Sequence, residues 1–141
     1  MKNPMTEPLR FILVDDDLFA LTLVEKLIQG FNEYTDTITF SSAREALKFI
    51  VQEYDLMKNK IPTVLLTDLH MPETNGFAFL GAIEKMDKAI MRQLHVFVLS
   101  AAACPEEIEK VLSHNCVRGY YNKPLSTEKI KEIIKRIQYP D

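Results

Sequence analysis

The sequence predicts an α/β fold: a single doubly wound domain in which five parallel strands alternate with five flanking helices. Short apolar runs alternate with segments of helical periodicity along the 141 residues, which is the order expected of βαβ units. Several of the runs are apolar throughout, as in strands that helices cover on both faces. Because crossovers between parallel strands are right-handed, the helices are expected on both sides of one sheet.

The first two strand and helix units occupy the N-terminal part of the chain. Residues 11–14 form the first predicted strand, and Asp17 is placed to cap a helix that Gly30 ends. A second strand is expected over 35–40. The segment Ser42-Ala-Arg-Glu45 then has the pattern of a capping box, which predicts the start of the second helix.

The middle of the chain contains the third strand, the third helix and the fourth strand. Residues 57–62 are largely polar and end in proline, which predicts a loop before a strand over 64–67. A helix is expected over 75–87, and the apolar run 96–99 is the next strand.

Two helices and one strand complete the predicted domain. Pro105 suits the first position of the fourth helix, and a fifth strand is expected over 117–121. Ser126 is placed to cap the last helix. That helix carries an apolar stripe with i, i+3, i+4, i+7 spacing, formed by Ile130, Ile133, Ile134 and Ile137.

Composition and charge narrow the function classes. The net charge is −3, and the lysines and arginines are scattered among acidic neighbours, which argues against nucleic-acid binding. No stretch approaches the roughly 18 apolar residues of a membrane span, and the N-terminus lacks a signal peptide's apolar core. We expect a cytoplasmic protein, one domain over 1–141, with its core over about 9–138 and a flexible segment over 1–8. Cys104 and Cys116 are expected as reduced thiols.

Residues with chemical potential follow the predicted strands. Asp15 and Asp16 come after the first strand, Asp68 after the third, Ser100 after the fourth and Lys123 after the fifth. Ligands of such sheets bind beyond the carboxyl ends of the strands, where the strand order reverses. These five side chains are therefore expected to share one pocket.

The expected pocket suits a divalent cation and a phosphoryl group. Two carboxylates about 4 Å apart repel each other by about 4 kcal/mol at an effective dielectric constant near 20. Mg²⁺ would offset this repulsion, because it binds carboxylate oxygens and keeps positions for water and a phosphoryl oxygen. In this interpretation Asp68 is the nucleophile, Lys123 neutralises charge and Ser100 donates a hydrogen bond.

Four segments resemble, in order and in spacing, the motifs of the receiver domain of two-component response regulators, of the stand-alone kind exemplified by the chemotaxis receiver. They are Ile12-Leu-Val-Asp-Asp-Asp17, Thr67-Asp-Leu-His-Met-Pro-Glu-Thr-Asn-Gly76, Val98-Leu-Ser-Ala101 and Gly119-Tyr-Tyr-Asn-Lys-Pro124. The resemblance covers nearly the whole chain. It implies a flavodoxin-like sheet with strand order 2-1-3-4-5.

The resemblance also implies how the site works. Asp68 is expected to accept a phosphoryl group from a histidine kinase or a histidine phosphotransfer protein. Mg²⁺ is expected as the cofactor, held by Asp15, Asp16, Asp68 and the backbone carbonyl of His70. Lys123 takes the place of the family lysine, followed by a cis bond.

A conformational switch is the second implication of the resemblance. Ser100 takes the place of the switch hydroxyl and Tyr120 that of the switch aromatic. Their movement would remodel the face formed by the helix behind Pro105, the strand 117–121 and the last helix. An unknown downstream protein would bind that face, and the chain itself is expected as a monomer or weak dimer.

Structural alternatives remain for the single residues. Asp17 is favoured as a helix cap over a metal ligand. The imidazole of His70 is favoured as a side chain at the pocket rim, and Tyr120 could be a packed aromatic. His70 and Ala102 are not the usual polar pair of the family, which leaves the lifetime of the phosphorylated state open.

Other function classes fit the residues less well. The leading hypothesis is an interaction module that catalyses only its own phosphorylation and dephosphorylation and is otherwise no enzyme. A phosphatase with an aspartyl nucleophile usually carries a second aspartate two residues on, where His70 stands. A flavodoxin-like cofactor carrier would need a phosphate-binding loop where Asp15, Asp16 and Asp17 stand. A degenerate receiver that acts as a scaffold is the remaining alternative.

Overall fold

The computed structural model describes residues 9–31, 35–56, 61–71, 75–101 and 104–138. The segment 1–8, expected to be flexible, and Ala102 lie outside the described residues. Among the helices in these ranges, none has both the length and the apolar character that a membrane crossing requires.

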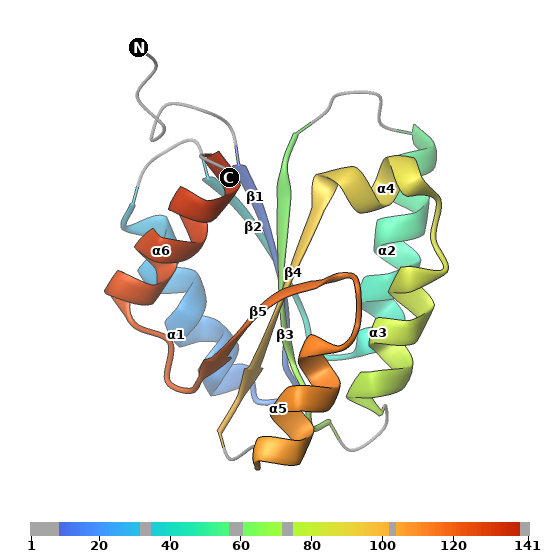
Figure 1. Cartoon of the computed structure of the whole chain (residues 1–141). Coiled ribbons are helices and arrows are strands. Elements are labelled where there is room, and N and C mark those ends of the chain that lie inside the picture. Colours follow the sequence, from blue (N-terminus) through green and yellow to red (C-terminus); the bar gives the residue numbers. More distant parts are fainter. Residues whose placement is uncertain (1–8, 32–34, 57–60, 72–74, 102–103, 139–141) are drawn as a thin grey trace.

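A parallel five-stranded sheet forms the centre of the domain (Figure 1). Its strands are β1 (Leu9–Val14), β2 (Thr35–Phe40), β3 (Thr63–Asp68), β4 (Leu94–Ser100) and β5 (Val117–Asn122). Their order in the sheet is β2-β1-β3-β4-β5, and every neighbouring pair is parallel. The predicted fold class and strand order are confirmed.

Helices cover both faces of the sheet. They are α1 (Leu18–Gln29), α2 (Ala43–Leu56), α3 (Gly76–Glu84), α4 (Lys88–Gln93), α5 (Pro105–Leu112) and α6 (Thr127–Gln138). Figure 1 shows α1 and α6 together on one face, with α2 and α3 on the other. Each face has its own core: Leu21 and Ile130 pack in one cluster, and Ala46, Leu80 and Val111 pack in the other.

One helix more is present in the described residues than the five that were predicted. The third helix was expected over 75–87, but α3 ends at Glu84 and a separate short helix, α4, follows. Asp87, expected inside the third helix, is instead the N-cap of α4, and its carboxylate accepts a hydrogen bond of 3.2 Å from the backbone N–H of Ala89. An aspartate satisfies free N–H groups at a helix start, so it favours a new helix there over continuation of the old one.

The register of the sheet brings the polar strand ends to one edge. Val14 pairs with Thr67, Asp68 with Leu99, and Ser100 with Asn122, so the strands end nearly level. The strand order reverses at β1, which has β2 on one side and β3 on the other. The edge beyond β1 and β3 is therefore the place where a ligand of this fold is expected.

Candidate functional site

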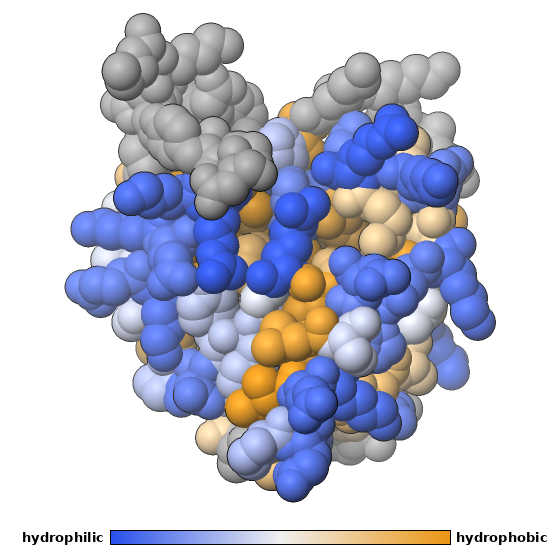
Figure 2. Space-filling model, in the orientation of Figure 1, coloured by the Kyte–Doolittle hydropathy of each residue, from blue (hydrophilic) through white to orange (hydrophobic). Residues whose placement is uncertain are grey.

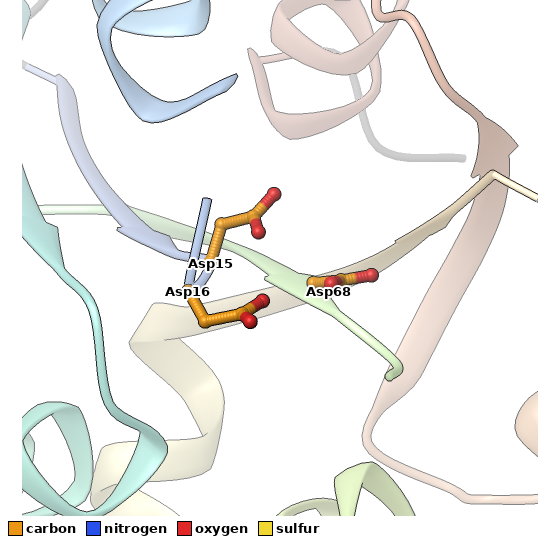
Figure 3. A group of neighbouring side chains, drawn as sticks. All are labelled: Asp15, Asp16 and Asp68. Carbon is orange, nitrogen blue, oxygen red and sulfur yellow. The ribbon is translucent and has the colours of Figure 1, made fainter. Parts of the chain in front are cut away.

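Three carboxylates meet at the carboxyl ends of β1 and β3. Figure 3 shows Asp15 and Asp16 directly after β1 and Asp68 at the end of β3. One oxygen of each of the three side chains lies within 4.8 Å of the other two. Asp15 and Asp68 are buried, whereas Asp16 is exposed. This confirms the expectation that the fold gathers these acids into one place.

Lys123 is the positive partner of the acids. Its Nζ donates a hydrogen bond of 2.5 Å to Oδ2 of Asp15 and lies 3.6 Å from Oδ2 of Asp68. Burial acts to lower the pKa of Lys123, but its hydrogen bond to Asp15 and the charge of Asp68 outweigh burial and raise it. The ammonium therefore stays charged and lies between the ends of β1 and β3.

The surroundings of Asp68 disfavour its ionised form. Burial raises the pKa of its carboxyl group, the charge of Lys123 opposes this rise, and the charge of Asp15 adds to it. The backbone N–H of His70 approaches Oδ1 of Asp68 at 3.5 Å. Lys123 alone therefore does not fully balance the negative charge at this site.

The side chain of Asp17 caps α1 and is not part of the acidic cluster. Its Oδ1 accepts hydrogen bonds from the backbone N–H groups of Phe19 at 3.0 Å and of Ala20 at 3.3 Å. Its own N–H donates to Oδ1 of Asp15 at 3.0 Å, which orients that carboxylate. The predicted role of Asp17 as the cap of α1 is confirmed.

Ser100 lies at the end of β4 with its side chain fully buried. Its carbonyl accepts a hydrogen bond of 3.0 Å from the backbone N–H of Lys123, which joins the two strand ends. Its hydroxyl Oγ is buried without a hydrogen-bond partner. A buried hydroxyl without a hydrogen-bond partner is rare in folded proteins.

The predicted switch residue Tyr120 and the predicted rim residue His70 are both more exposed than Ser100. Tyr120 on β5 is half-buried, and its hydroxyl donates to Oδ1 of Asn122 at 3.0 Å. The imidazole of His70 is more than half exposed and contacts Glu107 on α5. The bond between Lys123 and Pro124 is cis, as expected.

Gly76 shapes the segment that follows Asp68. A Cβ atom at this position would lie 2.3 Å from the carbonyl oxygen of Leu69, a distance that no side chain tolerates. The start of α3 can therefore approach the residue after Asp68 only because position 76 is glycine. A shallow depression of about 720 Å³ opens here, lined in part by Asp16, His70 and Asn75.

Comparison with known proteins decides the family. A family model described as the response regulator receiver domain matches residues 11–135. The chain belongs to this family. Receiver domains are phosphoryl-accepting signalling domains of two-component systems, and phosphorylation on an aspartate is their general function.

Relatives of this receiver domain come from bacteria, archaea and plants. The polar-differentiation response regulator DivK of Brucella anthropi is 27% identical over 91% of this chain and 94% of its own length. The probable methanogenesis regulatory protein FilR2 of Methanothrix harundinacea is 24% identical and is matched over 83% of its length. The chain spans only 17% of the rice two-component response regulator ORR22.

Solved structures share the fold. A response regulator receiver protein from Dyadobacter fermentans superposes with a TM-score of 0.80 at 30% identity, covering 94% of this chain and 99% of that one. The chemotaxis response regulator CheY4 of Vibrio cholerae gives a TM-score of 0.71 at 22% identity, covering 92% and 98%. At that lower identity the likeness shows the fold alone.

The side chains of this receiver domain fit the Mg²⁺ that the family binds in its acidic pocket. The donor set is three carboxylates, which are hard oxygen ligands of the kind Mg²⁺ takes in proteins. Three acids and one lysine leave an excess of two negative charges among these four groups. The raised pKa of Asp68 is a further sign that the pocket favours an added cation.

Sequence reasoning missed two residues that support this site. Asn75 caps α3, since its Oδ1 accepts a hydrogen bond of 2.8 Å from the backbone N–H of Phe77. Glu107 binds His70 from α5 at 3.2 Å. The cap could have been read from an asparagine before an apolar helix. The contact of Glu107 leaves no signal in the sequence pattern, because it joins two separate elements.

Proposed function

We propose that Asp68 is the phosphoryl acceptor of this receiver domain and that a histidine kinase or a histidine phosphotransfer protein is the donor. The observation that carries this proposal is the meeting of Asp68 with Asp15, Asp16 and Lys123 at one edge of the sheet. Asp68 is the buried acid of the central strand β3, while Asp15 is already hydrogen-bonded to Lys123. Together with the exposure of Asp16, these contacts support Asp68 as the nucleophile.

The reaction forms one bond and breaks one. A carboxylate oxygen of Asp68 attacks phosphorus, and the bond from phosphorus to the donor imidazole nitrogen breaks, so that its electron pair and a proton remain on the imidazole. Lys123 holds a positive charge beside the attacking carboxylate and favours its ionised form. In the hydrolysis that removes the group, water attacks phosphorus and the bond to Asp68 breaks. The electron pair of that bond stays on the carboxylate, and inorganic phosphate leaves with both protons of the water.

A bound Mg²⁺ would be held by Asp15, Asp16, Asp68 and the backbone carbonyl of His70, and would supply positive charge to the equatorial phosphoryl oxygens. Asp15 keeps its orientation through the N–H of Asp17 and Nζ of Lys123. The metal-binding role of each residue is thus supported by the donor chemistry and by the charge excess of the pocket.

The output is a phosphorylation-dependent contact with another protein. The hydroxyl of Ser100, buried and without a partner, is the donor that a phosphoryl oxygen would engage. A phosphoryl group carries about −2 charge and can draw this hydroxyl and Lys123 toward it. Tyr120, half-buried on β5, would then turn inward and change the face formed by α5, β5 and α6. Figure 2 shows a strip of hydrophobic side chains among hydrophilic ones on the face that carries β5.

The test is incorporation of a phosphoryl group. The protein is incubated with a small phosphodonor such as acetyl phosphate, with and without Mg²⁺, and its intact mass is measured. Wild type should gain one phosphoryl group only with Mg²⁺, and Asp68→Asn should gain none. Asp17→Asn is the matched control, because asparagine caps a helix as well as aspartate does. Modification of Asp68→Asn at the wild-type rate would refute the assignment.

A further inference from the structure

His70 contacts both Asp68, at the end of β3, and helix α5. Its backbone N–H points to Oδ1 of Asp68 at 3.5 Å, and an isolated antiparallel bridge pairs it with Asn75. Its Nε2 lies 3.2 Å from Oε2 of Glu107, although 56% of its side chain is exposed. A movement at Asp68 is thus two residues away from a side chain that touches α5.

Glu107 is held by both of its oxygens. While Oε2 contacts His70, Oε1 accepts a hydrogen bond of 3.4 Å from the backbone N–H of Cys104, in front of the first turn of α5. These two contacts fix the carboxylate at the start of the helix. A displacement of the carboxylate would therefore move the N-terminal end of α5, which lies beside the sheet edge that carries the site (Figure 1).

Helix α5 has further contacts with α3, but they lie further along it. Nζ of Lys110 lies 4.2 Å from the centre of the Phe77 ring, and Nδ1 of His114 contacts Glu84. These contacts hold the second half of α5 and the residues behind it. The pair of His70 and Glu107 instead joins the first turn of α5 to the segment that follows Asp68.

A phosphoryl group would compete for this pair. Its oxygens are strong hydrogen-bond acceptors with about −2 charge, and the imidazole two residues from Asp68 can donate either to them or to Glu107. The new charge also repels the carboxylate of Glu107 itself. Because a partly exposed pair is weak, its loss shifts the equilibrium between the held and the released start of α5 by no more than about fivefold. That is large enough to bias a switch and small enough to be reversed.

We propose that Glu107 is a positioning residue that acts through His70: the pair holds the start of α5 in its unphosphorylated position, and phosphorylation of Asp68 breaks the pair. The second half of this statement rests on the proposed function. The first half concerns the unmodified protein and is tested without phosphorylation.

The experiment measures hydrogen exchange of the α5 amides, residues 108–112, in the unmodified protein without Mg²⁺. His70→Ala and Glu107→Gln should each speed exchange, by up to about fivefold. Glu107→Gln keeps an oxygen for the N–H of Cys104, so it separates the pair from the cap. His70→Gln places an amide donor near the position of Nε2 and should restore most of the protection. Glu106→Gln removes an equal charge from the same turn, so it measures what the loss of that charge alone does to α5. Its effect should be smaller than that of Glu107→Gln, and an equal effect would overturn the proposal.

The double variant decides between a pair and two separate effects. If His70 and Glu107 act on α5 through each other, His70→Ala combined with Glu107→Gln exchanges no faster than either single variant. Additive effects would mean that Glu107 only caps the helix, and would overturn the proposal. So would wild-type exchange in His70→Ala.

Phosphorylation is examined separately with acetyl phosphate and Mg²⁺, with intact mass as the record of modification. Modified wild type should reach the α5 exchange of unmodified Glu107→Gln, and modified Glu107→Gln should gain little more. Modified wild type with unchanged α5 exchange would overturn the coupling. A protein that takes up no phosphoryl group would refute the proposed function, while the exchange of the unmodified variants would still decide whether the pair holds α5.

Discussion

Replacing Asp68 by asparagine should stabilise the protein in the absence of Mg²⁺. At an effective dielectric constant near 20, the attraction of Asp68 to Lys123 over 3.6 Å is about 5 kcal/mol. The repulsion from Asp15 within 4.8 Å is at least about 3 kcal/mol. The attraction thus exceeds the repulsion by about 2 kcal/mol. Burying the carboxylate costs on the order of 3 kcal/mol, which is about 1 kcal/mol more than this remainder. We expect Asp68→Asn to raise the free energy of unfolding by about 1 kcal/mol at pH 7.

The pH dependence follows from the raised pKa of Asp68. A carboxyl group whose pKa is higher in the folded than in the unfolded protein destabilises the fold once it ionises, so its cost is absent at low pH and complete above the folded pKa. The advantage of Asp68→Asn should therefore shrink as the pH falls toward 4.

The assay is urea denaturation followed by circular dichroism, in EDTA and in 10 mM Mg²⁺, from pH 7 to pH 4. Mg²⁺ should stabilise wild type more than Asp68→Asn, because a ligand that binds only the folded state stabilises it. Asp17→Asn serves as the control and should follow wild type. A variant less stable than wild type in EDTA at pH 7 would refute the electrostatic reasoning.

Three further predictions concern stability. Gly76→Ala should lose about 1–3 kcal/mol in urea denaturation, because its Cβ would collide with the carbonyl oxygen of Leu69, whereas Gly81→Ala, in the same helix with open space around it, should gain about 0.5–1 kcal/mol. Burial, aided by the charge of Arg118, lowers the pKa of His95 to about 4. As the pH falls from 7 to 5 the unfolded chain binds the proton before the folded protein does, so the free energy of unfolding of wild type should fall by about 1 kcal/mol more than that of His95→Gln. Parallel pH curves for the two proteins would contradict this. Lys123→Met should lose about 3 kcal/mol at pH 7 and recover part of it in Mg²⁺; no loss at all would show that the lysine does not balance the acids.

The sheet and the acidic cluster could be predicted because both leave local marks in the sequence. An apolar run followed by an acid is readable residue by residue, and parallel strands deliver their ends to one edge whatever the loops do. Asp15, Asp16 and Asp68 are therefore found together without any knowledge of the side-chain geometry. The same holds for Asp17, whose role as a cap depends only on the residues that follow it.

What could not be predicted depends on packing between elements. The division of the expected helix 75–87 into α3 and the start of α4 turns on Asp87, which is compatible with a helix interior and with a cap. The contact of His70 with Glu107 depends on the conformations of two side chains from separate elements. The unpartnered hydroxyl of Ser100 is likewise a fact of three-dimensional packing, although its place at a strand end was expected.

The most direct test of the central claim identifies the modified residue. Wild type treated with acetyl phosphate and Mg²⁺ is reduced with borohydride, which converts an aspartyl phosphate into homoserine, and the digested protein is sequenced by mass spectrometry. We predict homoserine at position 68 and at no other aspartate, and none when Mg²⁺ is omitted. Homoserine at Asp15 or Asp16, or an unmodified residue 68 in protein that has gained a phosphoryl mass, would contradict the account.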